Sequence, residues 1–547
     1  MATCFTAGAQ DTYYAELLSR NNYYGTARSV ALGGAMTALG GDLGSITFNP
    51  AGSAVNDYSQ FTITPGLLIS TTKAYYDPTG KEVFDGATST SKGRVNLPNI
   101  GLNLVFFSDD NSWITATSLG FIVNTTNTFL NYTTGRGVNP YTSFLGSMAS
   151  AAESGGSFDR TGSLYASYYA NQISEYGANN SGRFVGANEY LRADETGRYL
   201  PGALEQTAVY NTYGTKSDYV INMGFNVQDS FYFGFNLGIP CLKYTRQETF
   251  TEKAQNPEAH PVIFFDKDDK KVETNYISSK NMYALNSKAA GIYARFGFIS
   301  LLGENLRIGA AIQSPALIEI EEDWGYKASS TFANTKFSED SKSEDDGYSY
   351  NLRTPYIVDA GAALTIPEVG LLSVDYELTD YSVMKYSDIE PNMFGEDSWA
   401  VENYLNKTFC GVSHALRAGL EVKPADFLAL RAGYSFVTNP EKYWIDLSDN
   451  IVTAETWYSY SQAPKEVKYF EGLTQAFSLG AGFSSPGSFF ADFAVRLTKY
   501  PVSYFSPYYY GAYDAEDKNG NLLDVGAPIE LLDHSIFDAI LTVGWRF

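Results

Sequence analysis

The sequence predicts an all-β protein, a membrane-spanning antiparallel β-barrel of about 14 strands with long loops on one side. Three observations favour this class. Many segments alternate an apolar residue with a polar or small one, aromatic residues make up 15% of the chain, and an alternating stretch ends at Phe547. In a barrel only alternate residues face lipid, so no long apolar run is needed.

The stretch that ends at Phe547 has one apolar face. That face holds Phe537, Ala539, Leu541, Val543, Trp545 and Phe547. Such an ending is typical of bacterial outer-membrane barrels, whose last strand pairs with the first and removes both edges. We therefore expect Phe547 to be the barrel-assembly C-terminus, recognised by the barrel-assembly machinery. The alternative is an ordinary sheet protein whose final strand happens to end the chain.

Composition narrows the class of partner. The net charge is −23 and Lys and Arg do not cluster, so no nucleic-acid partner is expected. Tyrosine, at 42 residues, suits the headgroup level of a bilayer, and we expect outer-membrane lipid to surround a monomer. The three cysteines (Cys4, Cys241 and Cys410) lie far apart and form no metal-binding spacing, although one disulfide stays possible.

The N-terminal region differs from the rest. Residues 1–9 are interpreted as a signal-peptide remnant, because Ala7-Gly8-Ala9 resembles a cleavage site; the alternative is a start without meaning. Residues 10–56 show no strand alternation and are rich in small residues and glycine. They predict a compact, partly helical segment with close backbone approaches.

From Tyr58 onward the hydrophobic period is two, so residues 57–547 are expected to form the barrel. The clearest alternating segments are Ile100–Phe106, Tyr219–Val227, Phe231–Ile239, Ile292–Phe298, Leu372–Leu378, Leu416–Val422, Leu428–Phe436 and Phe477–Phe483. A soluble sandwich would show the same alternation with its polar face in water. The aromatic content, Phe547 and the signal remnant favour the membrane barrel.

Connections alternate in length. Lys423–Asp426 and Ser484–Ser488 are tight turns, which we assign to the periplasmic side. The long connections are assigned to the cell surface: Asn124–Ser217, Glu248–Ser287, Glu319–Leu352, Tyr386–Gly411 and Thr438–Gly472. The first of these, at about 124–218, is long enough to fold, and Tyr141–Glu153 and Ser163–Tyr176 are expected to be short helices over the barrel mouth.

No catalytic motif stands out, so no enzyme activity, cofactor or metal is expected. The chain has three histidines, and in Ser413-His414 and His534-Ser535 neighbouring side chains of a strand point to opposite faces. An outer-membrane hydrolase with a Ser–His pair assembled across strands is the weakest alternative. The segment Asp514–Asp524 resembles a calcium loop but lacks carboxylates at its first and twelfth positions, so Asp517–Gly520 is interpreted as a hairpin turn.

Two N-terminal motifs carry a family resemblance. Ala31-Leu32-Gly33-Gly34-Ala35, followed by Thr47-Phe48-Asn49-Pro50-Ala51-Gly52, resembles the hatch of FadL-type outer-membrane transporters of long-chain fatty acids and hydrocarbons. Similar segments continue through nearly the whole chain: Ile308–Pro315, Thr354-Pro355, Val374–Tyr381 and Leu416–Tyr434. The resemblance is to a Bacteroidetes-like member of the family, and the long loop at 124–218 departs most from the family pattern.

The resemblance implies a fourteen-stranded barrel closed by an N-terminal hatch. It places Phe48, Asn49, Pro50 and Ala51 in the gating part of the hatch, with Asn49 satisfying backbone groups in the lumen; a plain Asn-Pro turn is the alternative. Two prolines within strand-like runs, Pro98 and Pro240, are candidates for a strand kink that opens the wall, or for simple strand ends.

The function implied is passive uptake of hydrophobic small molecules, such as long-chain fatty acids. An outer groove of long loops would capture the ligand, an inner pocket near the hatch would receive it, and a lateral opening would release it. The ligand-binding residues are unknown at this stage. The alternative is a surface adhesion or partner-binding barrel, for which the tyrosine-rich Ser506–Tyr513 would be suited.

Overall fold

The structure is a computed structural model of the whole chain. It describes residues 2–3, 12–108, 112–177, 181–192, 197–265, 268, 270–390, 398–454, 456–457, 464–506, 508 and 514–547. The signal-peptide remnant predicted over 1–9 lies outside the described residues, except for the backbone of Ala2–Thr3. That pair forms strand β1, which runs parallel to β28 (Ser503–Phe505).

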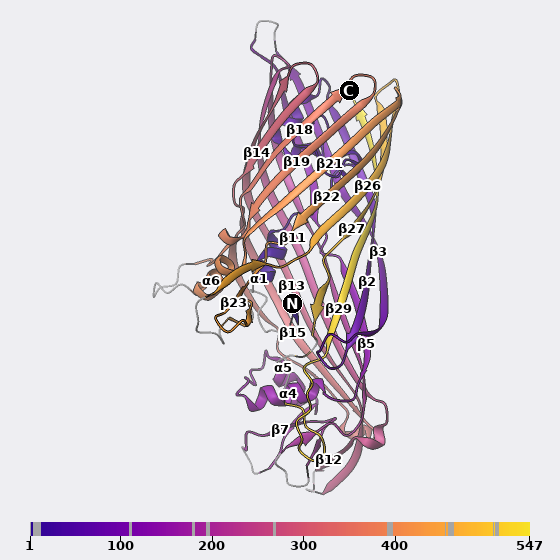
Figure 1. The fold of residues 1–547 in the computed structure, drawn as a ribbon, viewed down its shortest axis with the longest axis vertical. Helices are drawn as coiled ribbons and strands as arrows, with labels where there is room; N and C mark the ends of the chain where they lie inside the picture. Colours follow the sequence, from indigo (N-terminus) through magenta and orange to yellow (C-terminus); the bar gives the residue numbers. More distant parts are fainter. Residues whose placement is uncertain are drawn as a thin grey trace.

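Within the described residues, fourteen strands form a closed antiparallel ring, which confirms the predicted fold class (Figure 1). In order around the ring they are β2 (Gln60–Asp77), β3 (Asp85–Phe107), β4 (Ile114–Asn127), β10 (Leu204–Val227), β11 (Phe231–Ala254), β13 (Lys271–Leu302), β14 (Leu306–Gln313), β18 (Ile357–Ile366), β19 (Gly370–Asp380), β21 (Val412–Ala425), β22 (Leu428–Thr438), β26 (Leu473–Ser484), β27 (Phe489–Lys499) and β29 (Ile529–Arg546). Strand β29 then pairs with β2, so the ring has no free edge at this level.

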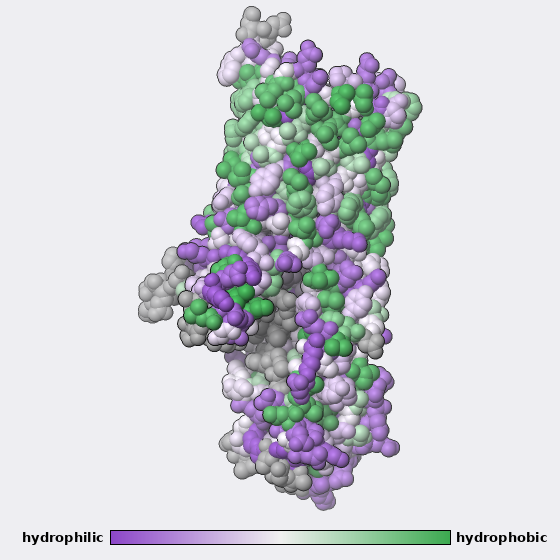
Figure 2. All heavy atoms as spheres, viewed as in Figure 1, coloured by the Kyte–Doolittle hydropathy of each residue, from purple (hydrophilic) through white to green (hydrophobic). Residues whose placement is uncertain are grey.

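Alternation explains why these residues form a barrel. In β26, Phe477 and Leu479 are exposed while Ser478 between them is buried. Apolar side chains thus point outward and small or polar ones inward, the reverse of a soluble sheet protein. Figure 2 shows these apolar residues gathered over the upper part of the barrel. No helix among the described residues is long and apolar enough to cross a membrane.

The two ends of the barrel differ, and we call them the short-turn end and the long-loop end. At the short-turn end β10 and β11 are joined through Gln228 and Asp229, whose φ angles of 53° and 55° match a type I′ hairpin turn. This end also contains the start of β2 and the end of β29 (Figure 1). The predicted tight turns at Lys423–Asp426 and Ser484–Ser488 lie here too.

The strands extend much further toward the long-loop end than the sequence predicted. The segments Glu248–Ser287 and Glu319–Leu352 are mostly strand and not loop, so that prediction is wrong. Strand β13 alone has 32 residues, whereas about 9 to 11 suffice to cross a bilayer. The outer face of this extension carries polar residues, so the sequence there does not alternate between apolar and polar residues, although the backbone hydrogen bonds between strands continue. The further strands of the extension are β5 (Asn131–Asn139), β12 (Pro261–Phe265), β15 (Leu317–Phe332), β16 (Glu339–Lys342), β17 (Asp346–Arg353) and β20 (Lys385–Asp388).

The helices predicted in the first long connection are present. They are α4 (Phe144–Glu153) and α5 (Ser163–Tyr169), and they lie beside the far end of the extension (Figure 1). The connection itself is shorter than 124–218, because β4 continues to Asn127 and β10 begins at Leu204. The remaining elements at this end are β6 (Ile173–Glu175), β7 (Phe184–Gly186), β8 (Tyr190–Leu191), β9 (Arg198–Tyr199), β23 (Lys442–Ile445), β24 (Ile451–Val452), β25 (Glu466–Tyr469), α6 (Ala400–Phe409), η2 (Pro257–Ala259), η3 (Thr335–Phe337) and η4 (Tyr381–Val383).

Candidate functional site

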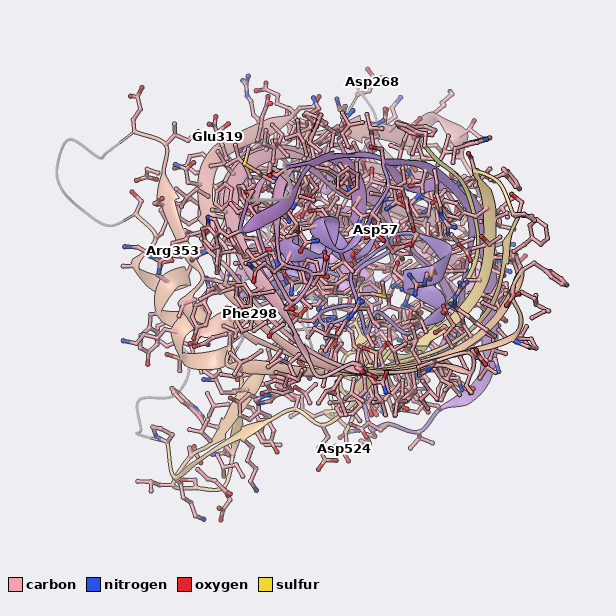
Figure 3. The ribbon with its side chains drawn as sticks, turned by 90° about the horizontal axis from the view of Figure 1, so that it is seen from above. Asp57, Asp268, Phe298, Glu319, Arg353 and Asp524 are labelled. Carbon is pink, nitrogen blue, oxygen red and sulfur yellow. The ribbon has the colours of Figure 1, made fainter. Side chains whose placement is uncertain are left out.

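The N-terminal segment lies inside the ring of strands, and we call residues 12–56 the hatch (Figure 3). It contains α1 (Thr12–Ser19), α2 (Ala27–Ala31), α3 (Ser45–Phe48) and η1 (Pro50–Val55). Its backbone bonds directly to the inner wall: Ala27 N donates to Thr542 Oγ1 at 2.7 Å, and Thr37 N to Asp375 Oδ2 at 2.6 Å. The wall side chains therefore satisfy polar groups of a segment that has little regular structure of its own.

Asn49 is fully buried and joins the hatch to the wall. Its Nδ2 donates to the carbonyl oxygens of Thr37 at 2.7 Å and of Phe298, in β13, at 2.9 Å. Its Oδ1 accepts from Ala51 N at 3.1 Å, which caps η1, and Pro50 occupies the first turn of η1, where no N–H donor is needed. The gating role of Phe48, Asn49, Pro50 and Ala51 stays a prediction.

Glycines in the wall make this approach possible. A Cβ atom at Gly297 of β13 would lie 2.1 Å from Asn49 Oδ1, and one at Gly234 of β11 would lie 2.4 Å from the carbonyl carbon of Pro50. The alternating glycines on the inward face thus mark where the hatch touches the barrel. The sequence shows these glycines, but not which hatch residue each one faces.

Charged side chains hold other parts of the hatch. Arg28 of α2 donates through Nε to Glu421 Oε2 at 3.2 Å, and Arg431 Nε donates to the same oxygen at 2.6 Å. Arg431 also pairs with Asp492 of β27, which extends the chain of charges across three strands of the wall. Deeper in the barrel, Arg417 donates to Glu377 at 2.8 Å. Its guanidinium lies 5.4 Å from the ring centroid of Phe48.

Two cavities along the hatch are small and not strictly apolar. One of about 20 Å³ lies among Lys216, Pro240 and Tyr293, and another of about 70 Å³ lies between the hatch and the wall near Arg417. For comparison, a buried cavity of about 150 Å³ holds benzene. Neither of these two cavities admits an aromatic hydrocarbon without movement of the hatch or of the tyrosines around it.

Pro240 interrupts the wall. In the ladder between β11 and β13, Gly238 pairs with Tyr293 and Cys241 with Ala290, and the residues between them are unpaired. Pro240 cannot donate a ladder hydrogen bond, which accounts for the gap. Pro240 and Tyr293 line the 20 Å³ cavity on the inner side, while Cys241 and Ala290 line an outer groove of about 630 Å³.

Pro98 lies at a different irregularity. The pairing of β2 with β3 shifts register between Thr64 and Gly66, opposite Pro98, and the ladder from β3 to β4 stops at Asn99. Beyond that point the third strand of the ring breaks at residues 128–130 and continues as β5, which pairs with β10 and not with β3. Both prolines thus mark interruptions of the ladder, and their role as a strand kink that opens the wall stays a prediction.

Two further strands break near Pro240. The seventh strand breaks between β14 and β15 at residues 314–316, and the eighth between β17 and β18 at 354–356. In each break a hydroxyl residue that precedes a proline replaces a ladder bond. Ser314 Oγ accepts from Ala294 N at 3.1 Å, and Thr354 Oγ1 accepts from Ala316 N at 2.9 Å. At this level the wall is therefore held by these hydroxyl groups together with two backbone bonds, from Ser314 N to Ala294 O and from Thr354 N to Ala316 O, each at 2.9 Å.

The structure shows no assembled catalytic group among the described residues. Ser413 is buried and His414 is exposed, as expected for neighbours on a strand. A cross-strand pair does exist, since Ser70 Oγ lies 3.1 Å from His534 Nε2. Within the described part of the chain no hydrogen bond or ion pair joins His534 to a carboxylate, and Ser70 is fully buried. No group of His, Cys, Asp or Glu in that part has the arrangement of a metal site.

Two buried carboxyl groups in the long-loop extension were not anticipated. Glu252 of β11 accepts hydrogen bonds from Phe144 N at 2.8 Å and from Gln206 Nε2 at 2.6 Å, and thereby anchors the start of α4. Burial raises the pKa of Glu252 to about 7, although these hydrogen bonds oppose the shift. Burial alone raises the pKa of Glu530, on β29, to about 8.

The remaining predicted sites are placed as follows. Phe547 exchanges two backbone hydrogen bonds with Ser59, at 2.9 and 3.0 Å, next to the pairing of β29 with β2. Asp517 to Gly520 forms the predicted turn, closed by a bond from Gly520 N to Asp517 O at 3.0 Å. Most of Ser506–Tyr513 lies outside the described residues; Tyr508 within it is fully buried and so offers no adhesive surface.

Comparisons with known proteins give similarities of fold. No protein-family model and no curated protein matches the chain. Among solved structures, the toluene transporter TodX of P. putida is 11% identical, with 96% of this chain and 98% of that chain covered and a TM-score of 0.47. A FadL homologue of Pseudomonas aeruginosa is 12% identical, with coverages of 96% and 98% and a TM-score of 0.46. The toluene transporter TbuX of Ralstonia pickettii is 12% identical, with the same coverages and a TM-score of 0.43.

Proposed function

We propose that the protein is an outer-membrane channel for the passive uptake of hydrophobic small molecules, such as long-chain fatty acids. The short-turn end would face the periplasm and the long-loop end the cell surface. The apolar outer band supports a position in a bilayer, and the enclosed hatch supports a barrel that is closed to water. The hatch spans residues 10–56 and the barrel 57–547 in this proposal.

The gap at Pro240 is the observation that carries the proposal. It lies between an inner cavity and an outer groove, so the ladder is interrupted where apolar cargo would leave toward lipid. A water-filled pore would expose such cargo to water, whereas a lateral exit keeps its apolar surface covered. Because the inner cavities are smaller than an aromatic molecule, transport requires the hatch and Tyr293 to move.

The gap can be tested by joining its two edges. Cys241 and Ala290 are directly opposite on β11 and β13, and opposite Cα atoms of such strands lie about 4.5–5.5 Å apart, within the range that a disulfide spans. The variant Ala290→Cys should form this disulfide under oxidation. Uptake of labelled fatty acid by cells that lack their own transporter should then fall, and return on reduction.

A matched control places the same disulfide away from the gap. Thr245 and Asn286 are opposite on the same two strands, so Thr245→Cys with Asn286→Cys in a Cys241→Ser background stiffens the wall elsewhere. This control should take up fatty acid normally in the oxidised state. Unchanged uptake in oxidised Ala290→Cys, with the disulfide shown by mass spectrometry, would exclude exit at Pro240.

A second function, binding of a surface partner, is favoured by the long-loop extension. Helix α5 exposes an aromatic cluster in which Tyr168 and Tyr169 have exposed fractions of 40% and 57%, and Phe158 packs against Tyr168. Triple substitution of these residues by serine tests this. Loss of cell attachment with normal fatty acid uptake would support adhesion, whereas normal attachment would count against it.

A further inference from the structure

We infer that the short-turn end contains a binding site for a small organic carboxylate, in a vestibule between the hatch and the seam of the barrel. The vestibule has a volume of about 410 Å³, within the usual range of small-molecule sites of about 300–1,000 Å³. Hatch residues Arg28 and Asp42 form one side, and Tyr58, Gln60, Phe490 and Arg546 form the other. The inference does not rest on the proposed uptake function.

Arg546 supplies a half-buried cation that has no carboxylate partner among the described residues. Its guanidinium lies between two rings, 5.0 Å from the centroid of Tyr58 and 4.7 Å from that of Phe490. It donates to Ser484 Oγ at 3.1 Å, and its Nε is buried with no hydrogen-bond partner within the described residues. No ion pair joins Arg546 to an acidic residue in that part of the chain. A guanidinium held in this way retains donors for an anion.

Gln60 places a second donor beside the first. It is the direct cross-strand partner of Arg546 where β2 meets β29, and both side chains face the lumen. Opposite residues on antiparallel strands have Cβ atoms about 4.5–5.5 Å apart. Gln60 has an exposed fraction of only 3%, yet its Nε2 has no partner among the described residues. Burying such a donor is costly unless a ligand or water accepts from it.

The other buried charges of the vestibule already have partners. Arg28 and Arg431 share Glu421, and Arg431 also pairs with Asp492. Asp42 accepts from Thr26 Oγ1 at 2.6 Å and from Gly44 N at 2.8 Å. Among the described lining residues, buried donors without a partner therefore remain at Gln60 and Arg546, which together fit a carboxylate, a group that only accepts. Lys423 also lines the vestibule but is exposed. The adjacent rings fit an apolar or aromatic body on that carboxylate.

The test uses para-fluorobenzoate and the purified full chain in detergent micelles, with binding followed by fluorine NMR. We expect saturable binding by the native protein, and affinity for para-fluorobenzamide lower by about tenfold or more, as loss of a charged hydrogen bond implies. Saturation separates a site from partition into micelles. Absence of saturable binding, or equal affinity for the neutral amide, would overturn the proposal.

Substitutions locate the site. Arg546→Met should weaken para-fluorobenzoate binding by about tenfold or more, while Arg353→Met, at the exposed end of β17 and outside the vestibule lining, should leave it unchanged. Because Arg546 lies at the barrel seam, Gln60→Leu and Gln60→Glu provide an independent pair. The first should weaken binding and the second, by charge repulsion, should weaken it further. Native affinity in both Gln60 variants would refute the assignment.

Discussion

The side-chain amide of Asn49 donates to the backbone carbonyl of Phe298 at 2.9 Å, and so ties the hatch to the barrel wall. The bond matters because strand carbonyls of a closed ring already serve the ladder, and few can accept from an inserted segment. Gly297, the neighbour of Phe298, provides the room for it. One amide thus links the turn before η1 with β13.

Removal of this amide should loosen the hatch. Asn49→Ala deletes two strong donor contacts and leaves the buried N–H of Ala51 without its acceptor, at a cost of about 1–3 kcal/mol. We expect faster amide hydrogen exchange in residues 45–55 and changed fatty acid uptake. Asn286→Ala, outside on β13, is the control. Native exchange rates in Asn49→Ala would show that the hatch is held by other contacts, such as Arg28 with Glu421.

The hydroxyl of Thr354 should be needed where the wall breaks. Thr354→Val keeps the shape but leaves Ala316 N, which is buried, without an acceptor, so unfolding should become easier by about 1–3 kcal/mol. The measurement is urea unfolding in detergent. Thr71→Val, whose hydroxyl contacts only exposed Ser91, should change stability little. Equal stability of the two variants would mean that water replaces the Thr354 hydroxyl.

Gly135 should be required for the position of β5. A Cβ atom there would lie 1.9 Å from Glu530 Oε1, and overpacking of this kind costs about 1–3 kcal/mol. Gly135→Ala should therefore lower the thermal unfolding midpoint. The control is Gly93→Ala in β3, where the nearest atom, Leu68 O, is 3.8 Å away. A midpoint for Gly135→Ala that matches this control would show that Glu530 swings aside without loss.

Rising pH should destabilise the long-loop extension through Glu530. Burial raises the pKa of Glu530 from 4.5 to about 8, so the folded state holds a proton more tightly than the unfolded state. Its contribution to stability is complete below pH 4.5 and is lost as pH rises through about 8. Thermal unfolding across this window should show the loss, and Glu530→Gln should remove it. Glu258→Gln, on an exposed turn, should keep the native pH dependence.

The ring of strands could be predicted from the sequence, but the length of the strands toward the long-loop end could not. Alternation over segments such as Phe477–Phe483 identified strands because lipid imposes an apolar outer face there. In the extension both faces of β13 carry polar or aromatic residues, so the sequence of Lys271–Ser287 shows no such alternation and predicts a loop. Its strand structure comes from pairing with β11 on one side and β15 on the other, and these two strands are far apart from each other in the sequence.

The candidate site was predictable in part. Asn49 and Pro50 could be assigned to a hatch because their motif precedes the first strand, and the Pro240 interruption follows from the missing N–H of proline. The partners could not be predicted. The contact of Asn49 with Phe298 spans 249 residues, and the neighbourhood of Gln60 and Arg546 exists only because the ring closes. Ser314 and Thr354 were visible as Ser-Pro and Thr-Pro, but their acceptor role depends on adjacent broken strands.

The seam between β2 and β29 has a consequence for the order of assembly. The hatch lies upstream of β2 in the chain, yet it is surrounded by strands up to β29. The ladder of this seam, from Gln60 with Arg546 to Asp77 with Ile529, joins residues almost a full chain length apart. A contact of such separation forms late, because the loop it closes is long. We therefore expect the hatch to take its position before β2 pairs with β29, so that the barrel closes around a segment that is already in place.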